Sequence, residues 1–155
     1  MDVCTFYSGQ GALAGIRAGH EGIIVDTHMP DTDHVQCAEI KQSLQTYFKG
    51  HTLKGLILTG FDSDHADSHG IDWILTQFKP GWIMYPKYFK DTECAKEVFA
   101  HIDRHERARA NSGNPLIRHS IRLDKLDDRV FADLAAHFEV EVFSPHIADM
   151  DCSNN

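Results

Sequence analysis

Between residues 22 and 143, short apolar runs alternate with longer stretches in which apolar residues recur every three or four positions. The longer stretches have the spacing of one helix face, as in Ile71, Ile74 and Leu75, and the short runs are typical of buried strands. This alternation predicts β-α-β units, in which parallel strands form a sheet and helices pack on it. Strands are predicted at 22–26, 56–59, 82–85, 116–121 and 140–143, and helices at 37–48, at 71–78, from 95 to the break at 111–115, and at 127–137.

The first twenty residues have a different pattern. Two strands are predicted there, at 3–7 and 12–17, with Gly9, Gly11 and Gly19 in the turns. A strand meander followed by β-α-β units predicts an α/β fold with a mixed β-sheet and flanking helices. The chain has 155 residues, of which 42% are hydrophobic, so we expect residues 1–155 to form a single domain.

Composition limits the location of the protein. No run approaches the roughly 18 consecutive apolar residues that a membrane-spanning helix needs. The opening Met-Asp-Val-Cys lacks the basic residues of a secretory signal, so we expect a cytoplasmic protein with no membrane segment. The four cysteines contain no C-x-x-C pair, so neither a zinc knuckle nor a disulfide framework is predicted.

The net charge of −8 argues against binding nucleic acid over a broad surface, because phosphate neutralisation needs clustered Lys and Arg. Basic residues nevertheless gather between positions 104 and 129. Candidates for a local anion-binding face are Arg104, Arg107, Arg118 and Arg122. A basic run of this kind is also typical of a solvated helix face and loop, and both interpretations stay open.

The most informative segment is the predicted strand at 56–59, which leads into a loop that holds Asp62, Asp64 and His65. Metal ligands need lone pairs that converge on one point, and a loop at the end of a strand can direct neighbouring side chains toward it. A cation would also offset the repulsion between the two aspartates. The alternative is that the aspartates cap the turn and the following helix, and that the histidine is an ordinary surface residue.

This segment resembles the signature of the metallo-β-lactamase superfamily, a strand followed by T-H-x-H-x-D-H. Thr59 matches the first position, Gly60 and Asp62 replace the two histidines that follow, and Asp64 and His65 match in place. The D-x-D-H variant resembles the branch found in the hydrolase domain of bacterial competence (DNA-uptake) membrane proteins.

Two further motifs lie upstream in the same order as in that branch. Residues 9–11, Gly-Gln-Gly, resemble its V-G-Q-G element, and residues 24–27, Ile-Val-Asp-Thr, resemble its I-D-T-G element. The resemblance implies a metallo-β-lactamase-like αββα fold of which this chain covers only about the first two-thirds. The rest of such a domain would come from a missing C-terminal half or from another chain.

Carried over position by position, the resemblance implies that Asp64 and His65 bind one metal ion and form the catalytic centre. Asp62 would belong to a second metal position. Asp26 would contact the metal-binding residues without binding the ion itself. His28, in place of the usual glycine, would face the opening of the same metal site.

The sequence departs from the family pattern at two places. Gly60 removes an imidazole from the first metal position, and the usual Gly-Gly after the signature is replaced by Asp67-Ser68. His69 and His146 are further candidate ligands or supporting residues.

The resemblance implies a hydrolase that uses a metal-activated water. The expected cofactor is one or two divalent ions, zinc or manganese, or none if the site is degraded. Carboxylates in place of imidazoles harden the ligand set, which moves the preference from zinc toward manganese, magnesium or iron. The expected substrate is a small-molecule or nucleic-acid phosphoester, most of all a phosphodiester or a related ester.

Two alternatives remain open at this point. Residues 9–14 fit G-x-G-x-x-A after a strand, and Asp26 ends a second apolar run, as in a Rossmann-type nucleotide or S-adenosylmethionine site. That interpretation requires residues 12–18 to form a helix. The other alternative is a non-catalytic scaffold of the hydrolase fold with a degraded metal site.

Overall fold

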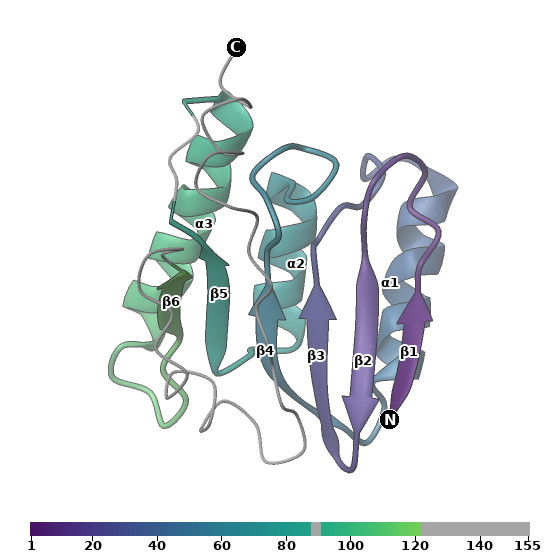
Figure 1. The fold of residues 1–155 in the computed structure, drawn as a ribbon, viewed down its shortest axis with the longest axis horizontal. Helices are drawn as coiled ribbons and strands as arrows, with labels where there is room; N and C mark the ends of the chain where they lie inside the picture. The colour runs from purple at the N-terminus through teal and green to yellow at the C-terminus, as the bar shows by residue number, and fades with distance from the viewer. Residues whose placement is uncertain (88–90, 122–155) are drawn as a thin grey trace.

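The computed structural model describes residues 1–87 and 91–121. Within these ranges the chain forms one six-stranded sheet and three helices (Figure 1). The strands are β1 (Asp2–Thr5), β2 (Ala14–Ala18), β3 (Glu21–Val25), β4 (Thr52–Ile57), β5 (Trp82–Pro86) and β6 (Ile117–Ile121). The helices are α1 (Val35–Tyr47), α2 (Ser68–Gln77) and α3 (Glu93–Arg109). The elements predicted at 127–137 and 140–143 lie outside the described residues, as do Arg122 and His146.

The order of the strands in the sheet is their order in the sequence. β1, β2 and β3 form an antiparallel meander, and β3 to β6 run parallel. Each helix connects two neighbouring parallel strands, and such crossovers are almost always right-handed. Because the sheet grows in one direction, the three helices lie on the same face (Figure 1). The predicted α/β class with a mixed sheet is therefore confirmed.

Several predicted boundaries are shifted. β4 begins at Thr52 rather than at residue 56, because Thr52 and Leu53 already pair with β3. Residues 14–18 form the strand β2, paired on both sides, so the helix at 12–18 that a Rossmann-type site requires is not formed. That alternative is wrong for this segment, and the prediction of a second strand is confirmed.

The strands bury side chains on both faces of the sheet. In β5, Ile83 and Tyr85 join the main core beneath the helices, and Trp82 and Met84 form a second cluster with Ile23. A strand that is buried on both faces has an unbroken apolar sequence rather than an alternating one, as in the run at 82–85. None of the described helices is long and apolar enough to cross a membrane.

Candidate functional site

The candidate site lies where the parallel strands β3 and β4 end. Asp26 directly follows β3, and the loop of residues 58–67 follows β4 and leads into α2. Because β3 and β4 are neighbours and parallel, the two segments emerge at the same edge of the sheet. This edge, at the carboxyl ends of parallel strands, is where open α/β sheets usually bind ligands.

Asp26, Thr59 and His65 form a connected hydrogen-bond network. The backbone N–H of Thr59 donates to Oδ1 of Asp26 over 2.7 Å, and the Thr59 hydroxyl lies 2.7 Å from Oδ2. Nδ1 of His65 lies 3.1 Å from Oδ2 of Asp26 and 2.9 Å from Oγ1 of Thr59. Asp26 is buried and has a φ of 58°, a left-handed conformation that aspartate tolerates better than most residues. The carboxylate of Asp26, to which the resemblance assigns a supporting role, thus contacts both ends of the turn that holds Asp62 and Asp64.

The network orients the imidazole of His65. An aspartate carboxylate only accepts hydrogen bonds, so Nδ1 of His65 carries the proton that faces Asp26. In the neutral ring the lone pair is then on Nε2, which lies 3.8 Å from Oδ2 of Asp64. The side chains of His65 and Asp64 are 39% and 54% exposed, so both are open to solvent. The loop therefore presents an imidazole nitrogen and a carboxylate side by side.

The backbone of the loop is held in place from several directions. The carbonyl of Asp62 accepts from the amides of His65 and Ala66 over 2.9 and 2.8 Å. The carbonyl of Asp64 accepts from Ala12, and the carbonyl of His65 accepts from Thr27, both over 2.7 Å. With these carbonyls paired, the loop backbone has little freedom to reorient its side chains.

Asp67 is a structural residue of the site that the sequence analysis recorded only as a departure from the family pattern. Its Oδ1 accepts from the amide of Gly70 over 2.7 Å, which caps α2, and its Oδ2 accepts from the amide of Met29 over 2.8 Å. Burial raises the pKa of Asp67, and the hydrogen bonds from Gly70 and Met29 offset part of that rise. An aspartate before a predicted helix is a recognisable N-cap signal, but its second contact could not be read from the sequence.

The other predicted ligands are arranged less favourably for a metal ion. The Asp62 side chain is exposed at the start of the loop turn, and His69 is exposed on the first turn of α2. In the part of the chain that the structure describes, no group of three or more His, Cys, Asp or Glu side chains is placed to hold a metal ion. The described residues thus supply the pair of Asp64 and His65 but not a complete ligand set.

Of the predicted anion-binding residues on α3 and β6, Arg104 and Arg118 contact acidic side chains and Arg107 contacts a backbone carbonyl. The guanidinium of Arg118 pairs with Asp103 and Glu106, the latter over 2.7 Å. Nε of Arg107 donates to the backbone carbonyl of Asp103 over 3.1 Å, and Arg104 pairs with Asp72. These contacts favour the interpretation of a compensated helix face over that of an open anion site.

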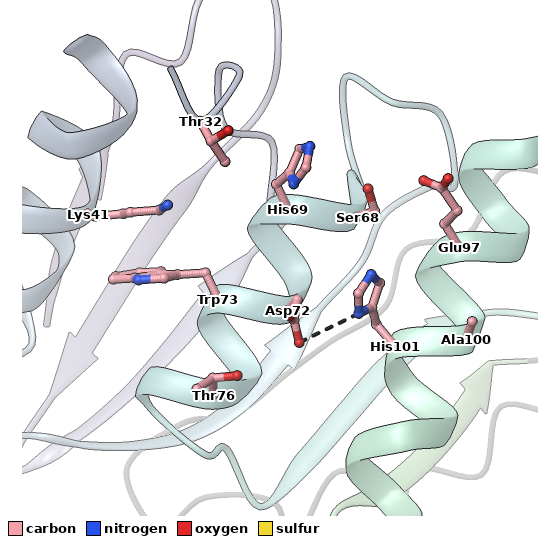
Figure 2. A pocket seen from close by; sticks show the side chains of 10 residues that line it. All are labelled: Thr32, Lys41, Ser68, His69, Asp72, Trp73, Thr76, Glu97, Ala100 and His101. Carbon is pink, nitrogen blue, oxygen red and sulfur yellow. Dashed lines mark ion pairs between the residues drawn. The ribbon is translucent and has the colours of Figure 1, made fainter. Parts of the chain in front are cut away.

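A groove of about 580 Å³ lies in the helical layer and is lined by residues of α1, α2 and α3 (Figure 2). Two of its lining residues, Asp72 of α2 and His101 of α3, lie 3.5 Å apart between Oδ1 and Nδ1. Nε2 of His105, which is outside the lining, lies 2.8 Å from the same Oδ1 of Asp72. Burial alone would raise the pKa of Asp72, but hydrogen bonds from His105 and Arg104 outweigh it and lower the pKa. The contacts of Asp72 with His101, Arg104 and His105 therefore tie α2 to α3.

Comparison with known proteins leaves the site to be interpreted from its own geometry. No protein-family model, curated protein or solved structure matches the chain.

Proposed function

We propose that this chain is part of a metal-dependent hydrolase of metallo-β-lactamase-like fold, which cleaves a phosphodiester or a related ester. The observation that carries the proposal is the buried Asp26 carboxylate behind His65. A carboxylate that accepts the second N–H of an imidazole is typical of metal-binding histidines, because it fixes the tautomer and makes the outer nitrogen a better ligand. The motifs around Gly9, Asp26 and Asp64 support the same family.

The chain's own residues would prepare the site in two ways. Asp26 and Thr59 hold Nδ1–H of His65, so that its Nε2 lone pair stays directed at the open side. Asp64, next to it, keeps its carboxylate within 3.8 Å of that nitrogen. A divalent cation bound by this pair would lower the pKa of a water molecule and polarise the ester.

The ligand set would be completed by donors beyond these two side chains. Asp62 is one candidate, and residues 122–155, which include His146, or another chain are further sources. Catalytic zinc sites use three protein ligands and one water molecule. Two protein ligands alone are therefore expected to bind a divalent ion weakly. A chain that binds no metal at all would instead favour the non-catalytic scaffold.

The proposal is tested by metal binding and hydrolysis on the full chain. Isothermal titration with Zn²⁺ and Mn²⁺ should detect binding that falls at least about tenfold in affinity in Asp64→Ala and in His65→Ala. Hydrolysis of bis(4-nitrophenyl) phosphate should require the metal and fall in the same two variants. The matched control is His20→Ala, because His20 is exposed at the turn before β3, at the opposite end of that strand.

Two outcomes would count against the proposal. Wild-type affinity for both metals in His65→Ala would show that the ion binds elsewhere. Absence of metal binding in the wild type, with circular dichroism that reports a folded chain, would favour the scaffold alternative.

A further inference from the structure

The ring of His28 contacts the loop of residues 58–67, the candidate loop, which carries Asp64 and His65. Its Nδ1 lies 2.7 Å from the backbone carbonyl oxygen of Ser63, between the two aspartates of the loop. A carbonyl oxygen only accepts hydrogen bonds, so Nδ1 of His28 must carry a proton and donate it. That nitrogen is therefore not free to bind a metal ion.

Gly11 provides the space that this ring occupies. A Cβ atom added at Gly11 would lie 2.0 Å from both Cγ and Cδ2 of His28, far inside van der Waals contact. Gly9, two residues earlier, has a φ of 83° and no neighbour within 4 Å of an added Cβ. The two glycines of the motif thus serve different needs: Gly9 allows a turn conformation, and Gly11 allows the ring of His28 to lie against the backbone.

Backbone hydrogen bonds join the same three segments. The amide of His28 donates to the carbonyl of Ala12 over 3.2 Å, and the amide of Ala12 donates to the carbonyl of Asp64 over 2.7 Å. The loop is therefore bonded at Ser63 by a side chain and at Asp64 by the residue that follows Gly11. The N-terminal hairpin, the segment after β3 and the candidate loop form one hydrogen-bonded unit.

We propose that His28 is a positioning residue, which rests on Gly11 and holds the Ser63 carbonyl so that Asp64 and His65 point outward together. Its catalytic consequence rests on the proposed function, but its effect on the loop does not. Gly11 of the Gly-Gln-Gly motif then leaves the space in which the His28 ring packs against the backbone. Its value to the site is steric, and no phosphate contact by its backbone is required.

The test is a double-mutant cycle on the full chain, read by amide hydrogen exchange. His28→Ala should speed exchange of the Ala12, His65 and Ala66 amides at least tenfold, because the loop loses an anchor. Gly11→Ala should do the same, because its methyl group displaces the ring. The double variant Gly11→Ala/His28→Ala should be no worse than His28→Ala alone, since the steric conflict is gone.

The matched control is Gly113→Ala, because a Cβ at Gly113 meets nothing within 4 Å. This variant should leave exchange in the loop unchanged. Additive effects in the double variant, or unchanged exchange in His28→Ala, would overturn the proposal. If the variants fail to fold, ¹⁵N NMR of the wild-type His28 ring decides: the Nδ1–H tautomer is expected at neutral pH, and the Nε2–H tautomer would refute it.

The two proposals fail in distinguishable ways. If the chain binds metal and hydrolyses the phosphodiester probe, His28→Ala should lower kcat at least tenfold while KM changes little. If it does neither, the exchange measurements still test the contact between His28 and the loop. Normal exchange together with lost metal binding in His28→Ala would make His28 a ligand instead.

Discussion

Asp26 is the residue whose replacement tests the candidate site most directly, because its carboxylate connects three donors. Asp26→Ala removes the acceptor for the amide and hydroxyl of Thr59 and for Nδ1 of His65. Asp26→Asn keeps an acceptor oxygen for the Thr59 amide but replaces the second oxygen with an NH₂ group. The two variants therefore separate loss of the whole network from loss of its charge.

The expected magnitudes follow from the number and kind of hydrogen bonds. Bonds to a charged acceptor contribute about 1.5–3 kcal/mol each, and they are not additive within one network. Asp26→Ala also places alanine at a φ of 58°, which costs about 1–2 kcal/mol. We expect Asp26→Ala to lower the free energy of unfolding by about 3–5 kcal/mol. Asp26→Asn should lower it by about 1–3 kcal/mol, because asparagine tolerates the left-handed conformation.

The Asp26→Asn variant should also change the tautomer of His65. An amide NH₂ at the former Oδ2 position donates to Nδ1, so the ring proton should move to Nε2. The measurements are urea denaturation followed by circular dichroism and ¹⁵N NMR of the His65 ring, both on the full chain. If Asp26→Asn is as destabilising as Asp26→Ala, or if His65 keeps its Nδ1–H tautomer, the reasoning is wrong.

Three further substitutions can be checked by urea denaturation. Gly70→Ala should lower the free energy of unfolding by about 1–3 kcal/mol, because the added Cβ would lie 1.7 Å from the carbonyl oxygen of Thr27. A urea midpoint equal to that of the wild type would contradict this. Burial raises the folded-state pKa of Asp67. The contribution of Asp67 to folding stability is therefore largest below the usual pKa of an aspartate, and it is lost as the pH rises through the raised pKa. Asparagine can keep the cap bond from Gly70 but loses the acceptor for the Met29 amide at every pH. Because it does not ionise, the stability of Asp67→Asn relative to the wild type should nevertheless increase from pH 4 to pH 7, and a relative decrease would contradict this. For Asp72, burial is outweighed by bonds from His105 and Arg104 and the pKa is lowered, so its contribution is present above the unfolded value of 3.8 and lost as pH falls below it. The difference in the free energy of unfolding between the wild type and Asp72→Asn should therefore shrink from pH 6 to pH 3. A constant difference would argue against the contacts of Asp72 with His105 and Arg104.

The fold was largely predictable because its signals are local. The strand at 82–85 is a short apolar run before a proline, and the helix face of Ile71, Ile74 and Leu75 is buried as its spacing predicts. The end of α3 at Arg109 agrees with the break predicted at 111–115, although the last turns of the helix carry mainly charged residues. Arg109 is nevertheless buried there, where it donates to the carbonyls of Pro80 and Asn114.

The sequence motifs select the residues of the candidate site but do not predict the hydrogen bonds between them. Asp26 and the loop aspartates could be selected from motifs, yet the contact between Thr59 and His65 joins residues on opposite sides of a turn. Thr59 entered the sequence analysis only as a motif match, and the structure places it inside the network. The resemblance implies that His28 faces the mouth of the metal site, but the contact of its Nδ1 with the Ser63 carbonyl could not be read from the sequence. Sequence patterns report residue types, and such hydrogen bonds depend on how distant segments pack.

The convergence of Asp26 and Thr59 depends on an irregularity in the pairing of β3 with β4. Gly22 pairs with Leu53 but Ile23 pairs with Gly55, so Lys54 is an extra residue in β4. Beyond it the ladder continues in the new register, and the amide of Asp26 donates to the carbonyl of Ile57 over 2.7 Å. A one-residue change of register exchanges the two faces of a strand and shifts everything that follows it. Without the extra residue, Asp26 would lie one position earlier along β4, and its carboxylate would lie one residue further from Thr59. The geometry of the candidate site thus depends on the register shift between Gly22 and Ile23, immediately before the motif at residues 24–27, and on Lys54, upstream of Thr59.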